Sequence, residues 1–293
     1  METFFTTLGD EVQDVYEETF HLFSQNSALQ DLGMLDPKTT TLDLTIAGRD
    51  FTITQSPGAL QSNRTEGTTG AAVWQTSVRV AEWLSVLFTG GVLGSSSTVL
   101  ELGSGISGII PCILAPKVGT VIATDQQHLL KIMRENITAN TSQTRARSSK
   151  HTVGKPIAVS SHATNIRVIP LDWEEDDVQN VLSSSGLGAI DVVFASDCIY
   201  NYALIEPLMQ TCLDICKLRS PQSNDGGHYQ APTMCVIAQQ LRQAEVFEQW
   251  LQTTLREFRV WRVPDEMLTD GLAGGSGFAV HVCILRGGQG ERR

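Results

Sequence analysis

Three glycines and a preceding acid form the stretch of this sequence whose residue types and spacing most directly suggest chemistry. Gly103-Ser-Gly105-Ile-Ser-Gly108 follows the G-x-G-x-x-G pattern, directly after the apolar run 98–102 and where a helical pattern begins. Glycines let a ligand approach the backbone closely, and the first turn of a helix has free N–H groups that can bind it. Taken alone, this pattern suits the pyrophosphate of a dinucleotide equally well.

Two acids lie near the glycines, and the first of them narrows the choice of ligand. Glu101 stands two residues before Gly103, and a carboxylate there suits a cationic sulfonium or amino group better than a pyrophosphate. This favours S-adenosylmethionine as the cofactor, bound around Gly103, Ser104 and Gly105. Asp125 ends the next apolar run, about twenty residues further on, where it could bind both ribose hydroxyls of either cofactor class.

Two tryptophans could complete a cofactor site. Trp173 lies in Leu171-Asp-Trp-Glu174, after a third apolar run, and could cover an adenine ring. Its alternative role is to cap a hydrophobic edge. Trp74 follows Thr68-Thr-Gly70 at the start of a helical pattern and could close over the amino-acid end of the cofactor. The alternative for Trp74 is plain core packing.

Short apolar runs alternate with amphipathic segments through the rest of the chain. The predicted strands are 98–102, 119–125, 167–171, 189–195, 233–238, 258–261 and 278–285. The predicted helices are 73–89, 107–115, 126–139, 175–184, 203–218 and 243–257. Such alternation predicts an α/β fold with a parallel sheet and right-handed crossovers. The last two strands have no helix between them, so one of them should pair antiparallel.

The segment before this regular part reads differently. Residues 1–37 are acidic and partly amphipathic, and two alternating runs around Gly48 predict a β-hairpin. We therefore expect an N-terminal extension, 1–70, packing on a main domain, 71–286, with a tail at 287–293. The main domain has a basic, Ser-rich insertion at 141–164, expected to be a flexible surface segment or a contact arm for an acidic or RNA-bearing partner.

Composition and charge limit the class of partner. The 293 residues include 21 Lys and Arg against 32 Asp and Glu, a formal net charge of -11. Because phosphate binding needs clustered positive charge, direct nucleic-acid binding is not expected, whereas a basic protein partner is, unless the charge serves solubility alone. Six cysteines without a C-x-x-C pair suggest a reduced cytoplasmic or nuclear protein. We expect no membrane span, no secretory signal, no metal site and a monomer.

These motifs together resemble a known family. The matching residues are Thr69-Gly70, Trp74, Val99-Leu-Glu-Leu-Gly-Ser-Gly105, Ala123-Thr-Asp125, Leu171-Asp-Trp173 and Ala195-Ser-Asp-Cys-Ile-Tyr200. In this order, across roughly residues 40–285, they look like the methyltransferase-16 group of seven-β-strand protein-lysine methyltransferases. The long N-terminus, the glycine loop and the Ser-rich insertion look most like the branch of fungal ribosomal lysine N-methyltransferase 5.

The resemblance implies a fold and a set of residue roles. The fold is the Rossmann-like class I methyltransferase fold: a seven-stranded, mostly parallel sheet with a reversed last strand and helices on both faces. The residues that fall where the family contacts S-adenosylmethionine are Trp74, Gly103, Ser104, Gly105, Asp125, Trp173 and Ala195, and Glu101 matches the acid of the first motif. Asp197-Cys-Ile-Tyr200 matches the D-x-x-Y motif at the substrate entrance. The family acts on proteins, several of them in translation, so a basic and ribosomal substrate is expected.

Asp197 and Tyr200 are accordingly the candidate catalytic residues. A lysine ammonium must lose its proton before it can attack a methyl group, so we expect Asp197 to orient the amine and Tyr200 to shape the channel. The alternative for Asp197 is an N-cap for the helix that follows. Other possible functions are methylation of RNA or a small molecule on the same fold, a nicotinamide-dependent oxidoreductase, and a non-catalytic binding module. The Asn-Pro-Pro-Tyr pattern of amino-methylating nucleic-acid enzymes and a hydride-transfer constellation are both missing.

Overall fold

The computed structural model describes residues 2–25, 33–60, 68–87, 93–148, 165–219 and 231–287. Its helices are α1 (Glu2–Thr7), α2 (Val15–Gln25), α3 (Pro57–Leu60), α4 (Gln75–Leu87), α5 (Ile109–Leu114), α6 (Leu130–Ser148), α7 (Val178–Ser184), α8 (Tyr202–Lys217) and α9 (Ala244–Glu257), with short 3-10 turns η1 (Thr69–Ala71) and η3 (Asp265–Met267). Its strands are β1 (Thr41–Ile46), β2 (Arg49–Thr54), β3 (Thr98–Leu102), β4 (Thr120–Asp125), β5 (Ile166–Pro170), β6 (Val192–Ser196), β7 (Met234–Gln240), β8 (Phe258–Arg262) and β9 (Phe278–Leu285).

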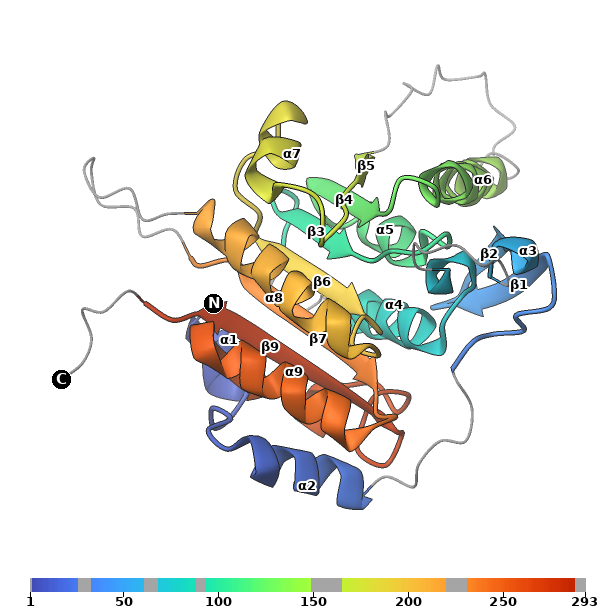
Figure 1. Ribbon diagram of the computed structural model, residues 1–293. Helices are drawn as coiled ribbons and strands as arrows, with labels where there is room; N and C mark the ends of the chain where they lie inside the picture. The colour runs from blue at the N-terminus through green and yellow to red at the C-terminus, as the bar shows by residue number, and fades with distance from the viewer. Residues whose placement is uncertain are drawn as a thin grey trace.

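Seven of the strands form one sheet in the order β5-β4-β3-β6-β7-β9-β8. The first five of these run parallel, and β9 pairs antiparallel with both β7 and β8. The predicted α/β fold with a reversed last strand is therefore confirmed. The reversed strand lies inside the sheet, between β7 and β8, so that β8 forms the edge (Figure 1).

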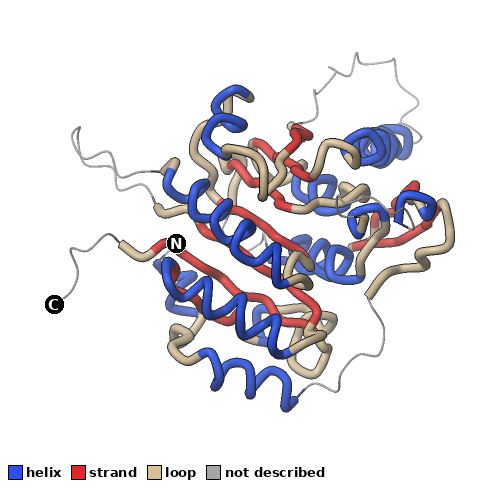
Figure 2. The backbone as a smooth tube through the Cα atoms, in the orientation of Figure 1, coloured by secondary structure: helices blue, strands red, loops and turns tan. Residues whose placement is uncertain are grey.

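Helices cover both faces of this sheet, as Figures 1 and 2 show. One core cluster joins α4, α5 and α6 to one face, and a second joins α2, α7, α8 and α9 to the other. The central strands β6 and β7 are buried along their whole length, as expected of parallel strands covered on both sides. Within the described ranges, no helix is long and apolar enough to cross a membrane.

The predicted hairpin is present and packs against α6. Ala47 and Gly48 form its two-residue turn, with φ values of 50° and 73°, whereas the alternating runs indicated the three-residue turn Gly48-Arg-Asp50. Asn136 and Asn140 of α6 each bind a backbone N–H and C=O of β2, at 2.8–3.0 Å. Each asparagine amide thus satisfies the edge of β2 as a neighbouring strand would.

The N-terminal helices lie far from the hairpin, on the other side of the molecule (Figure 1). The pattern over residues 1–37 resolves into two helices, because Gly9 has a φ of 81° and Val12 donates a backbone hydrogen bond to Val260 of β8 at 2.7 Å. Residues 141–148 of the expected insertion continue α6, which corrects that part of the expectation, while 149–164 lie outside the described residues.

Candidate active site

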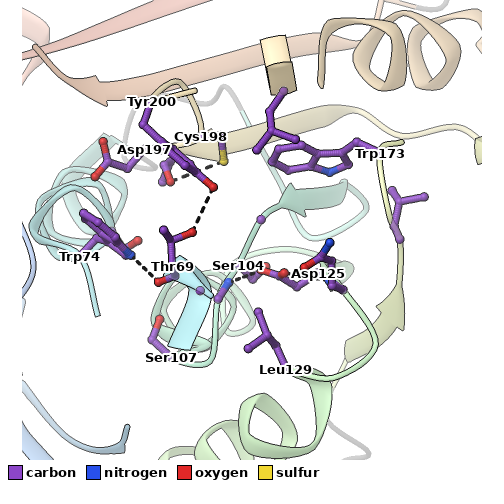
Figure 3. Close-up of a pocket in the computed structure, with 18 of the residues that line it drawn as sticks. Thr69, Trp74, Ser104, Ser107, Asp125, Leu129, Trp173, Asp197, Cys198 and Tyr200 are labelled. Atoms are coloured by element: carbon purple, nitrogen blue, oxygen red, sulfur yellow. Dashed lines mark hydrogen bonds between the residues drawn. The ribbon is translucent and has the colours of Figure 1, made fainter. Parts of the chain in front are cut away.

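A cleft of about 910 Å³ opens at the carboxyl ends of the parallel strands. It is lined by the segments that follow β3, β4, β5 and β6, together with η1 and the start of α4 (Figure 3). In open α/β sheets a ligand binds at this edge, where the strand order reverses direction. Here β3 lies between β4 and β6, so the glycine turn after β3 lies at that reversal.

The glycine turn packs closely against its neighbours and leaves no room for side chains at Gly103 and Gly105. Gly103 and Gly105 have φ values of 64° and 60°, which residues other than glycine seldom adopt. A Cβ on Gly105 would lie 3.1 Å from the carbonyl oxygen of Gly70, and the Ile106 N–H donates to that oxygen at 2.9 Å. A Cβ on Gly103 would lie 3.2 Å from the indole of Trp173. These glycines therefore hold η1, the turn and Trp173 close around the cleft.

Asp125 lies at the end of β4 and also fixes the turn. Its two carboxylate oxygens accept hydrogen bonds from the backbone N–H groups of Gly105, at 2.7 Å, and Gln126, at 2.8 Å. Burial raises the pKa of this carboxyl above its usual range, and the two backbone hydrogen bonds oppose that shift. Each oxygen has a second lone pair, so the carboxylate can still accept hydroxyl groups from a ligand in the cleft.

Glu101 lies beneath the cleft and does not line it. Its side chain is buried in β3, and burial raises its pKa to about 8, which the neighbouring Ser104 hydroxyl opposes only in part. Within the described part of the chain, its Oε2 atom has no hydrogen-bond partner. The carboxyl group is therefore protonated in much of the free protein at neutral pH.

The two tryptophans lie on different walls of the cleft (Figure 3). The indole of Trp173 is half-buried and faces the glycine turn, and its N–H has no partner among the described residues. The Trp74 N–H donates to the Thr69 carbonyl at 3.0 Å, and the guanidinium of Arg242 lies 5.3 Å from the centre of its ring. Both rings thus line the cleft as well as packing against the protein.

Asp197 follows β6 in a left-handed conformation, with a φ of 62°. Its two carboxylate oxygens pair with Arg242, at 2.7 and 2.6 Å, and its side chain is 3% exposed. The N-cap of α8 is Asn201, whose side chain accepts from the Ala203 N–H at 3.1 Å. The alternative of Asp197 as that N-cap is therefore wrong, and its partner is an arginine that the sequence pattern did not indicate.

Tyr200 and Thr69 meet across the mouth of the cleft. Their hydroxyl groups are 3.0 Å apart and share a hydrogen bond, drawn in Figure 3. Cys198 lies between Asp197 and the glycine turn, and burial raises the pKa of its thiol well above the ordinary value. A thiol held protonated is a poor nucleophile. The polar groups at this mouth are therefore hydroxyls and a paired carboxylate.

The sequence-predicted residues mostly gather in this one place. Those that line the cleft are Trp74, Gly103, Ser104, Gly105, Asp125, Trp173, Asp197 and Tyr200. Ala195 does not, because strand alternation directs its side chain into the core, and the next residue, Ser196, lines the cleft instead. Sequence reasoning missed Ser107, Leu129 and Arg242. The first two lie in the turns before α5 and α6, and Arg242 follows a strand without a motif.

The lining fits a cofactor that has both a nucleoside and a cationic amino-acid end. Two buried polar atoms at the cleft have no partner among the described residues: Trp173 Nε1 and Ser196 Oγ. Buried polar atoms are rarely left unpaired in folded proteins, so such a group marks a place for a ligand or water. Together with the acids and the glycine cradle, these atoms suit S-adenosylmethionine, whose sulfonium and amino groups are positive.

Comparison with known proteins agrees with this chemistry. A family model described as lysine methyltransferase matches residues 58–222. Ribosomal lysine N-methyltransferase 5 of Zygosaccharomyces rouxii is 32% identical over 239 residues, which cover 72% of each chain. A diaminohydroxyphosphoribosylamino-pyrimidine deaminase of Schizosaccharomyces pombe is 33% identical over 251 residues, 85% of this chain. This chain spans about half the length of that relative, 53%.

Among solved structures, the O-methyltransferase from Bacillus cereus in complex with SAH is similar with a TM-score of 0.41 and 11% identity, covering 78% of this chain and 86% of that one. A putative transferase from Pyrococcus horikoshii has a TM-score of 0.42 and 14% identity, covering 85% and 73%. Likenesses this low say nothing about the residues of the site.

Proposed function

This chain belongs to the lysine methyltransferase family, and on that premise we propose that it methylates a lysine side chain of a basic, translation-related protein, such as a large-subunit ribosomal protein. The name of the Zygosaccharomyces rouxii relative supports the ribosomal part of this proposal. The name of the Schizosaccharomyces pombe relative is not transferred, because this chain spans only about half of it. The observation that carries the proposal is a glycine-and-acid cradle that opens toward the paired Asp197 carboxylate and the Tyr200 hydroxyl.

S-adenosylmethionine is the cofactor of this family, and it supplies a methyl group already activated by the neighbouring positive sulfur. In our proposal Gly103, Ser104 and Gly105 hold its amino-acid end, and the positive charge of the bound cofactor favours the ionised form of the buried Glu101 carboxyl beneath them. Asp125 accepts the ribose hydroxyls, and Trp173 covers the adenine. Trp74 closes the opposite wall, where the Thr69 carbonyl fixes its indole.

The protein's own task in the transfer is to bring a neutral amine into line. The lysine nitrogen forms a bond to the methyl carbon while the carbon–sulfur bond breaks, so its lone pair must first be freed by loss of a proton. A site that excludes water favours the neutral amine, because burial penalises the ammonium. We assign Asp197 and Tyr200 the orientation of this amine. Arg242 donates to both oxygens of Asp197, and the Gln240 backbone N–H donates to Oδ1 as well, at 3.3 Å. The second lone pair of Oδ2 is therefore the one available to the acceptor.

The partner follows from charge. With a formal net charge of -11, the chain attracts a basic protein and repels free nucleic acid. We infer a monomer that works in the cytoplasm, where six free and buried thiols stay reduced.

Labelled S-adenosylmethionine, incubated with the full chain and a lysate from cells lacking it, tests the function. We expect label in a protein of basic isoelectric point, removed by protease and found on lysine after hydrolysis. Label in RNA or in small molecules would contradict the lysine assignment.

The roles at the mouth can be tested with a matched pair of variants. Asp197 and Asp191 flank β6 at its two ends, and each forms an ion pair with an arginine. Asp197→Ala should remove turnover, while Asp191→Ala, at the opposite end of the strand, should keep it. Full turnover by a folded Asp197→Ala protein would show that the carboxylate does not act on the acceptor.

A further inference from the structure

A second cavity, of about 860 Å³, adjoins the cofactor cleft. The two share the residues Thr69, Trp74, Asp197 and Tyr200. The hydrogen bond between Thr69 and Tyr200 and the paired Asp197 carboxylate therefore lie on the boundary between the two spaces. Anything that enters the second cavity reaches this boundary from the side opposite the glycine turn.

The walls of the second cavity are mainly apolar and come from distant parts of the chain. The apolar lining residues are Phe23, Met34, Trp74, Ile199, Leu241, Val246 and Phe247. Phe23 belongs to α2, whereas Val246 and Phe247 belong to α9. Helix α2 therefore supplies one wall of a space that Met34 and Thr69 of the N-terminal extension and residues of the main domain also line.

Helix α2 is held in place by a buried polar contact. The Glu18 carboxylate binds Nε2 of the fully buried His281 at 2.9 Å, and Arg262 lies 3.4 Å from its other oxygen. The rings of Phe23 and Phe247 meet at 5.9 Å between centroids. Figure 1 shows α2 running along α9. The position of Phe23 is thus fixed relative to the sheet.

One polar side chain in these walls lacks a partner. Gln239 of β7 lines the cavity and is 2% exposed, and its Nε2 atom has no hydrogen-bond partner in the described part of the protein. A buried amide N–H without an acceptor destabilises a protein, so such groups are usually paired. A ligand with a carbonyl oxygen would satisfy it.

We propose, on the basis of the lysine methyltransferase function above, that the second cavity receives the acceptor residue and that α2 is part of the acceptor site. The aliphatic stem of the lysine packs against the cavity wall that Phe23 and Phe247 form, and its amine reaches Asp197 and Tyr200 at the boundary. The Gln239 amide donates to a carbonyl oxygen of the acceptor's main chain. The N-terminal extension thereby selects the substrate.

A bisubstrate probe tests this with binding as the readout. The probe joins the S-adenosylhomocysteine skeleton to the side-chain nitrogen of an Nα-acetyl-lysine amide. Calorimetry compares its affinity with that of S-adenosylhomocysteine alone. The wild-type chain should bind the probe more tightly than S-adenosylhomocysteine. Phe23→Ala should weaken the probe roughly tenfold and Gln239→Leu roughly fivefold, with S-adenosylhomocysteine affinity unchanged in both.

Phe20→Ala is the matched control, because Phe20 lies on the same helix but is 75% exposed; it should leave both affinities unchanged. Gln239→Leu lies on β7 and keeps the test valid if Phe23→Ala loosens α2. The proposal is overturned if the lysine arm adds no affinity, or if Gln239→Leu leaves the probe's affinity unchanged. A failure of the proposed function would appear elsewhere, as absent lysine label in the lysate while the arm still adds affinity.

Discussion

The buried carboxyl of Glu101 should make this protein less stable as the pH rises through neutrality. In the folded chain its pKa is about 8, raised chiefly by burial from an ordinary value of 4.5. Replacement by glutamine keeps the shape of the side chain and removes the titration. The comparison of wild type with Glu101→Gln therefore isolates this one group from Asp125, whose pKa burial also raises.

The sign follows from proton binding. Between pH 4.5 and 8 the folded chain holds a proton on Glu101 that the unfolded chain has lost, so the free energy of unfolding falls as the pH rises through this window. Integrating the two titration curves gives a loss of about 2–3 kcal/mol between pH 5 and pH 7. Below the unfolded pKa the contribution is fully present, and above the folded pKa no further loss occurs.

Equilibrium unfolding in urea, at a series of pH values without added cofactor, measures the effect. The stability of Glu101→Gln relative to wild type should rise by about 2–3 kcal/mol between pH 5 and pH 7. Glu135→Gln is the control for the loss of one carboxyl group, because Glu135 is an exposed acid on α6. A constant difference for Glu101→Gln would refute a raised pKa at this position.

Three further changes have defined outcomes. Gly105→Ala should destabilise the chain by about 1–2 kcal/mol in urea, because a left-handed alanine is strained, and should abolish S-adenosylhomocysteine binding in calorimetry. Arg242→Ala leaves the Asp197 carboxylate buried without its partner and should cost about 3 kcal/mol in the same unfolding assay. The Arg242→Ala, Asp197→Ala double variant should recover part of that loss. Burial would raise the pKa of Glu18, but the hydrogen bond from His281 and the nearby positive charges outweigh it, so the pKa in the folded chain is lowered. The stability that the ionised Glu18 contributes is therefore lost as the pH falls through this folded pKa. Acid should therefore destabilise wild type more than Glu18→Gln, as measured by unfolding at decreasing pH.

Local patterns were sufficient to predict most of the fold. Continuous apolar runs with intervening amphipathic segments predicted the strands and helices of the main domain, because buried parallel strands carry no alternation. The segment 1–37 was harder, since α1 and α2 contact β8, β9 and α9 near the far end of the chain. The partner of Glu18 is 263 residues away, and no periodicity in the sequence relates the two.

The candidate site likewise combines residues that a local sequence pattern predicts with one that only a contact between distant segments brings in. Apart from Trp74, the residues that the sequence indicated lie in the last part of a strand or on the turn directly after it, where a motif and its backbone geometry occupy the same few positions. Arg242 follows β7 in a similar turn, but it belongs to the site only because β7 lies beside β6. Its guanidinium then meets a carboxylate 45 residues earlier in the chain. The D-x-x-Y pattern therefore predicts Asp197 and Tyr200 at the mouth of the cleft but not the arginine that pairs with Asp197. Asp197 is a fixed, charge-neutralised pair with Arg242, and its position, rather than a free negative charge, is what it offers an approaching amine.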